Sequence, residues 1–109
     1  MEFIINNRPW YIKFVSAASS NLRRSDGSLT VGVTDGNDNC VYLSDLLSGT
    51  FLKKVLCHEL CHCFMMSYNI SIPIEQEEFL ADWISIHGED LIYLLDDLMS
   101  AMSREVQYG

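Results

Sequence analysis

The first half of the chain alternates between hydrophobic and polar residues in short runs, the pattern of half-buried β-strands. Alternation is clearest in residues 10–15, and residues 3–5 can pair with that run across a short turn. Residues 29–35 and 40–45 form two more runs, joined by the Gly, Asn and Asp residues of a hairpin turn. Residues 16–28 are polar and indicate a loop with room for a short helix. This half therefore predicts a small antiparallel β-sheet.

The second half carries hydrophobic residues at helical spacing. Residues 46–69 predict a first helix and residues 77–88 a second, which Gly88 ends or kinks. Residues 89–107 predict a third helical piece. The apolar positions of that piece are Leu91, Ile92, Leu94, Leu95, Leu98 and Met102. Strands followed by helices predict an α+β fold, in which two or three helices follow the small sheet.

The length and the net charge of the chain limit its number of domains and its possible partners. A chain of 109 residues, 49% of them hydrophobic, fits one domain spanning residues 1–109. Its net charge of −8, from 15 acidic and 7 basic residues, argues against a nucleic-acid partner. The candidate for a local basic patch, Arg23 and Arg24, is interpreted as solvated loop charge. The sequence does not predict an oligomeric state.

The N-terminus lacks the features of a signal peptide, and no apolar run is long enough for a membrane span. We therefore expect no membrane partner and a location in the cytoplasm of a bacterial or phage-infected cell. In that compartment the cysteines stay reduced. Cys57, Cys61 and Cys63 crowd one helix and are interpreted as small buried hydrophobes, although no role can be assigned to them individually.

Residues 58–62 read His-Glu-Leu-Cys-His. His58 and His62 lie one helical turn apart on one face, and Glu59 follows the first of them. Two imidazoles at this spacing chelate zinc, and the adjacent glutamate reaches the catalytic water. The rest of this helix is apolar, so its polar groups need a partner to offset the cost of burial. A metal ion would supply that partner.

A catalytic zinc site needs a third protein ligand and one open position. Glu78 and Asp82 share a face of the second predicted helix, beside small residues that allow close approach. Glu78 can complete a His₂Glu site, and Asp82 can accept a hydrogen bond from the outer nitrogen of a ligand histidine. The alternative is an acidic, solvated first turn favoured by the helix dipole, which is the interpretation given to Glu75 and Glu77.

The segments "HELCH" and "EFLAD" resemble the zinc peptidases of the ImmA/IrrE type, which occur in phages and bacterial mobile elements. The resemblance covers roughly residues 40–88. It implies a minimal zincin-like fold with the metal site between the helices, and a protein or peptide substrate such as a transcriptional repressor. It implies one Zn²⁺ ion with three ligands, His58, His62 and Glu78. Glu59 would be the general base, and Asp82 would support a ligand from outside the metal site.

The expected activity is hydrolysis of a peptide bond by a water molecule that zinc and Glu59 activate. The substrate would add a strand along residues 40–44, taken as the edge of the sheet. The developing oxyanion also needs a hydrogen-bond donor. The candidates are His87, Tyr42, Tyr68 and Tyr93, with His87 slightly preferred among them, although a surface histidine at a helix end is the more frequent interpretation of such a residue.

Three other interpretations stay open. A SprT-like protease would use His87 as the third ligand in place of Glu78, although the acidic charge opposes the DNA-associated substrates of that family. A protein of this size could also bind metal and sequester a partner without cleaving it. Finally, Cys57 and Cys61 could bind a metal as thiolates, although they point away from the two motif histidines.

Overall fold

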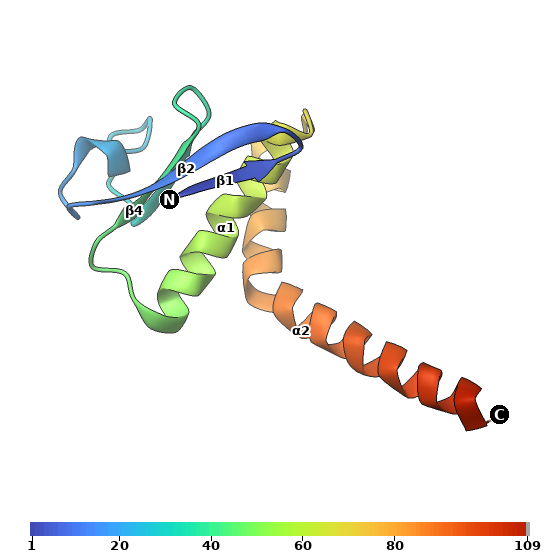
Figure 1. The fold of residues 1–109 in the computed structure, drawn as a ribbon. Helices are drawn as coiled ribbons and strands as arrows, with labels where there is room; N and C mark the ends of the chain where they lie inside the picture. Colours follow the sequence, from blue (N-terminus) through green and yellow to red (C-terminus); the bar gives the residue numbers. More distant parts are fainter. Residues whose placement is uncertain (109) are drawn as a thin grey trace.

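The computed structural model describes residues 1–108 as a small sheet followed by two helices (Figure 1). The elements are β1 (Glu2–Ile5), β2 (Arg8–Val15), a 3₁₀ turn η1 (Ser20–Leu22), β3 (Gly32–Asp35), β4 (Cys40–Ser44), α1 (Gly49–Ser67) and α2 (Ile74–Tyr108). The α+β class, both hairpins and the first helix are confirmed. Within the described residues, neither helix has a stretch long and apolar enough to cross a membrane.

The sheet is mixed, so the prediction of a wholly antiparallel sheet is wrong. Its strand order is β1-β2-β4-β3, and β2 runs parallel to β4, with Ile12 opposite Val41. β4 takes this interior position because every one of its residues is buried. Such continuous burial is typical of a strand covered on both faces. β4 is therefore not the edge strand that the sequence indicated, and the edge on this side is β3.

α1 covers one face of the sheet and forms the main core with it (Figure 1). Trp10 is fully buried in this core, and its indole nitrogen donates a 2.8 Å hydrogen bond to Ser67 Oγ near the end of α1. The other buried members are Ile5, Val41, Leu43, Leu47 and Cys63. On the opposite face of the sheet, Leu22 of η1 packs with Cys40 and Tyr42 of β4. The two faces of β4 thus serve separate hydrophobic clusters.

α2 is one helix of 35 residues, so of the two outcomes predicted for Gly88, an end or a kink, the helix does not end there. Its first part runs antiparallel to α1, and Figure 1 shows it changing direction and then projecting away from the rest of the chain. The described chain measures 60 × 30 × 27 Å, with a radius of gyration of 17.1 Å. A compact domain of this length would have a radius near 13 Å. The projecting helix accounts for this difference.

The four cysteines are free, as expected. Cys40 and Cys63 are buried, while Cys57 and Cys61 are partly buried. Burial raises the pKa of the Cys61 thiol to about 11 and that of the Cys63 thiol to about 12. These groups are therefore neutral thiols near pH 7 and pack as small apolar side chains.

Candidate metal centre

Two helices bring the polar residues of the site together. His58 and His62 occupy one face of α1, one turn apart. A left-handed residue, Asn69, ends the helical path after α1, and its neighbour Ile70 donates a backbone hydrogen bond to Met65. The chain then reverses into α2. Ala81 is fully buried, and its small side chain lets α2 approach α1 closely.

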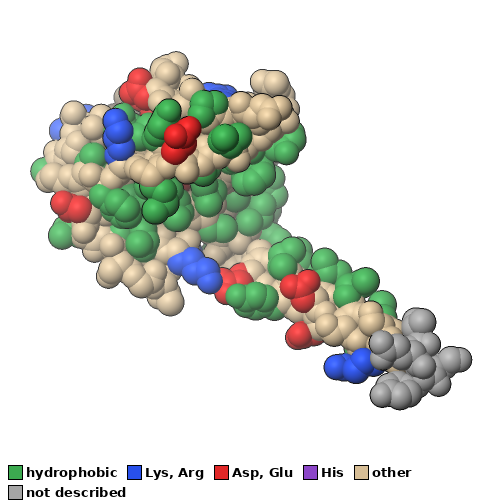
Figure 2. All heavy atoms as spheres, viewed as in Figure 1, with side chains coloured by type: hydrophobic (Ala, Val, Ile, Leu, Met, Phe, Trp, Pro, Cys, Tyr) green, Lys and Arg blue, Asp and Glu red, His purple; other side chains and the backbone are tan. Residues whose placement is uncertain are grey.

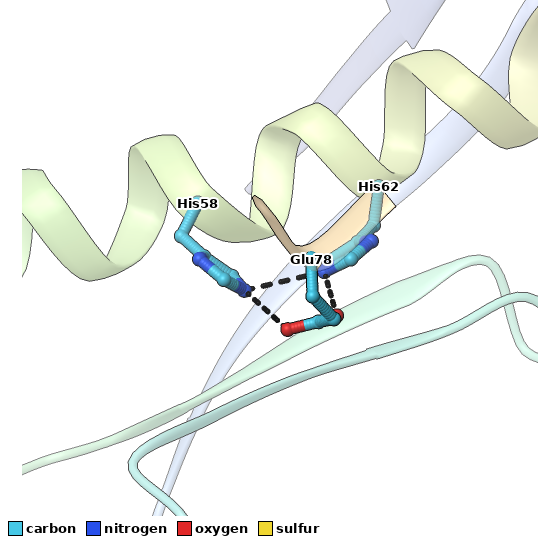
Figure 3. Close-up of side chains that lie close together, drawn as sticks. All are labelled: His58, His62 and Glu78. Atoms are coloured by element: carbon cyan, nitrogen blue, oxygen red, sulfur yellow. Dashed lines mark hydrogen bonds and ion pairs between the residues drawn. The ribbon is translucent and has the colours of Figure 1, made fainter. Parts of the chain in front are cut away.

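Three side chains converge from these helices (Figure 3). The Nε2 atoms of His58 and His62 are 3.2 Å apart. Glu78 from α2 places Oε1 2.8 Å from His62 Nε2 and Oε2 3.4 Å from His58 Nε2. One ligand atom from each residue lies within 4.8 Å of the others, so this group could hold a metal ion.

The outer nitrogens of both imidazoles have carboxylate partners. His58 Nδ1 lies 2.8 Å from Asp82 Oδ1, and His62 Nδ1 lies 2.7 Å from Glu77 Oε2. A carboxylate only accepts hydrogen bonds, so each Nδ1 carries a proton, and in a neutral imidazole the Nε2 atom is then an acceptor. Two acceptor nitrogens and a carboxylate then face one another. This arrangement favours a cation at the centre of the group.

Glu59 is buried beside this group. Its Oε1 accepts a 2.9 Å hydrogen bond from Thr34 Oγ1 of β3, and its Oε2 lies 4.0 Å from His58 Nε2. Gly32 of β3 makes the close approach possible, because a Cβ there would lie 3.2 Å from Glu59 Cγ and 2.9 Å from Val55 Cγ1. The sheet therefore holds one carboxylate oxygen and leaves the other next to the imidazoles.

The site opens into a cleft between α1, β3 and the loop before β3. Two adjoining hollows of about 480 Å³ and about 200 Å³ share Arg24, Gly32, His58 and Glu59 in their walls. Glu77 and Glu78 line the larger hollow, and Lys54, Asp82 and Phe51 line the smaller one. The basic pair at residues 23–24 thus faces the cleft, although the sequence indicated only solvated loop charge. The walls of the cleft therefore carry both basic and acidic side chains, although the chain as a whole is acidic.

The other candidates do not reach this group. Tyr42 lies on the opposite face of the sheet from α1, where its hydroxyl donates to Asp38 Oδ2 at 3.3 Å. His87 is exposed and its ring packs against Trp83, nine residues past Glu78 and so on the opposite side of α2. Tyr93 is exposed, about 16 Å further along α2 than Asp82. Tyr68 is exposed and stacks on Phe64.

Cys57 and Cys61 do not belong to the metal-binding group of the described residues. They lie at other angles around α1 than the two histidines. The geometry therefore gives no support to a thiolate metal site.

Glu77 is the site residue that sequence reasoning missed. It was interpreted as part of a solvated first turn, but only 16% of its side chain is exposed, against His62. Glu77 lies one turn before the buried Ala81 and so shares the face that packs on α1. This spacing was the available signal. Thr34 gave no comparable signal, because its role depends on how β3 docks against α1.

Comparison of the chain with protein-family models, with curated proteins and with solved structures gives no match. Function is therefore argued from the residues of the site and their arrangement.

Replacing Glu77 by Gln tests its contact with His62. We expect metal affinity to fall about 10–100-fold, as for other changes to partners of metal-binding histidines, because the amide holds the imidazole less firmly. Competition with a chromophoric chelator measures the affinity. Glu75→Gln is the matched control, because Glu75 is an exposed neighbour in the same first turn. Equal affinities of the two variants would contradict a supporting role for Glu77.

Proposed function

We propose that the chain is a zinc-dependent peptidase. One observation carries the proposal: a buried carboxylate, Glu59, lies beside a group of two imidazoles and one carboxylate that could hold a metal ion. In this proposal His58, His62 and Glu78 bind the metal, and Glu59 is the general base. Burying a carboxylate costs free energy unless a nearby positive charge stabilises it, and such groups are frequent in active sites.

The donor set favours zinc among common ions. Two imidazole nitrogens and one carboxylate are typical ligands of catalytic zinc, whereas Ca²⁺ and Mg²⁺ prefer oxygen alone. Ligands of a tetrahedral zinc site, with bonds of about 2.0–2.2 Å, are roughly 3.3–3.5 Å apart. Here the two imidazole nitrogens are 3.2 Å apart, and each lies near a different oxygen of Glu78, His62 at 2.8 Å from Oε1 and His58 at 3.4 Å from Oε2. Three protein ligands would leave one position for water or substrate.

When bound, zinc polarises the scissile carbonyl and lowers the pKa of a coordinated water molecule. Glu59 accepts the proton from the attacking water through Oε2 and delivers it to the leaving nitrogen. Thr34 holds the other oxygen of Glu59 and so fixes the direction of the proton transfer. Asp82 and Glu77 keep both ligand histidines in the tautomer that leaves Nε2 free.

β3, rather than β4, is the strand along which a substrate would lie. β3 has a single strand neighbour and borders the cleft that contains His58 and Glu59. An extended peptide can pair with such an edge through its main chain, and this supports a protein segment as the substrate. Arg24 and Lys54 line the same cleft and are the available cations for a developing oxyanion or an acidic substrate side chain. A transcriptional repressor is the substrate class that the ImmA/IrrE resemblance suggests.

A proteome-derived peptide library tests the proposal, because it offers the chain many different peptide bonds at once. We expect the zinc-loaded chain to create new peptide N-termini, since Glu59 can activate water next to the metal. Mass spectrometry detects the termini, and a chelator followed by added zinc provides the control. A zinc-loaded chain that cleaves nothing would contradict the proposal and favour a metal-binding protein that sequesters a partner.

A further inference from the structure

The projecting part of α2 exposes a long hydrophobic surface. Figure 2 shows hydrophobic side chains along this part of the helix. Each of seven aliphatic side chains in residues 91–102 is between 47% and 57% exposed. They are Leu91, Ile92, Leu94, Leu95, Leu98, Met99 and Met102. Isolated exposed hydrophobes are ordinary, but a contiguous set on one helix indicates a contact surface.

No described element of the chain can cover this surface. Glu89 of α2 pairs with Lys53 near the start of α1, with 2.7 Å between Oε2 and Nζ. α1 begins at Gly49, so α2 runs past the end of α1 soon after this pair. The remaining stretch of α2, residues 94–108, extends roughly 22 Å beyond that point at 1.5 Å per residue. Its hydrophobic face therefore requires a partner from outside the described chain.

The spacing of the hydrophobic residues is that of a coiled-coil helix. Four of them recur at intervals of four, three and four residues, as alternate core positions of a heptad do. These core residues are Leu91, Leu95, Leu98 and Met102. Ile92, Leu94 and Met99 lie on either side of these core residues, and the seven side chains together form a hydrophobic stripe along the helix. The opposite face carries Glu89, Asp90, Asp96, Asp97, Ser100, Ser103 and Arg104.

We infer that this face pairs with the same face of a second copy of the chain. Each half-exposed side chain offers on the order of 100 Å² of apolar area, so the seven together offer roughly 700 Å² per copy. A stable interface of standard size buries about 800 Å² per partner. The stripe alone therefore comes close to the area that a stable dimer needs.

The charges fit an antiparallel pairing of two copies. Glu89, Asp90, Asp96 and Asp97 lie outside the stripe, so two acidic chains meet without burying a carboxylate between them. When the two helices run antiparallel and cross midway between Leu95 and Leu98, Leu95 of one copy lies beside Leu98 of the other.

The mass in solution tests this inference independently of the proposed peptidase activity. Light scattering after size-exclusion chromatography should give twice the 12.5 kDa of one chain at tens of micromolar. The double variant Leu95→Glu, Leu98→Glu should weaken the dimer by about 100-fold or more, because it places charge in the interface. The matched control is Ser100→Glu with Ser103→Glu, which adds equal charge to the outer face and should remain dimeric.

Two results would overturn the inference. One is a wild-type chain of single mass up to about 100 μM, well above the dissociation constants of stable dimers. The other is a dimer that persists in the leucine variant. Both leucines are exposed and lie outside the core, so the variant should keep its helical circular dichroism and its metal content. Loss of either property would show that the face serves the fold of a single chain, which also contradicts the inference.

Discussion

Replacing Glu59 by Gln should reduce peptide hydrolysis by about 10²–10⁴-fold and leave the metal content unchanged. Glutamine has nearly the same size and can still accept the hydrogen bond from Thr34. It cannot accept the proton of the attacking water. The expected loss therefore appears in kcat/KM for a peptide identified in the library experiment, with the metal measured by elemental analysis of the same samples.

Thr34→Val is a useful comparison for Glu59→Gln. Valine keeps the shape of the side chain but removes the hydroxyl that holds the Glu59 carboxylate, so we expect a smaller loss of activity. Full activity of Glu59→Gln would exclude Glu59 as the base. Loss of metal in that variant would instead mean that Glu59 supports the metal group, and the change in rate would then say nothing about proton transfer.

Replacing Glu78 by Ala should abolish stoichiometric metal binding, because it removes one of the three proposed ligands. The matched control is His87→Ala on the same helix, which removes an exposed ring that packs against Trp83. We expect near-stoichiometric zinc in the wild-type chain and in His87→Ala, and almost none in Glu78→Ala. A ligand present at 100 times its dissociation constant adds about 2.7 kcal/mol to the free energy of unfolding. Chelation should accordingly lower the Tm of the two metal-binding forms but not that of Glu78→Ala.

The opposite pattern would change the interpretation of the site. Zinc retained in Glu78→Ala and lost in His87→Ala would favour the SprT-like arrangement and would require α2 to turn about its axis. A wild-type chain that takes up no zinc even after reconstitution would contradict the metal site itself. The cluster of His58, His62 and their carboxylates would then be a set of structural hydrogen bonds.

The helical periodicity of the sequence determines which residues of this site could be predicted. The positions of His58 and His62, or of Glu78 and Asp82, follow from helix geometry once a helix is assigned. The sequence also suggested that these two pairs would meet, and in the structure they do. Glu77 was missed because the rotation of α2 about its axis is set by packing against α1. No local pattern reports that rotation.

The sheet and the long helix show the same limit. Both hairpins follow from nearby turn residues, but the pairing of β2 with β4 joins distant segments and depends on burial of both faces of β4. Gly88 was expected to end or kink a helix. A glycine in a helix costs only about 1 kcal/mol, so α2 continues through Gly88, and Figure 1 shows this helix changing direction along its length. Helix propensity alone could not decide whether the helix ends at Gly88 or continues through it.

The residues of the metal group come from two helices joined by a short connection, and this has a consequence for the mechanics of the molecule. Apart from Ala81, the α2 side chains that the structure describes are partly buried or exposed, and α2 packs chiefly against α1. An ion shared by His62 and Glu78 would cross-link the chain across about 15 residues, which in the chain-entropy view of a covalent bridge is worth on the order of 3 kcal/mol. The ion would then stabilise the fold as well as take part in the reaction. Loss of the ion would weaken the attachment of α2 to α1, so the position of the projecting helix would depend on the same ion as the proposed chemistry.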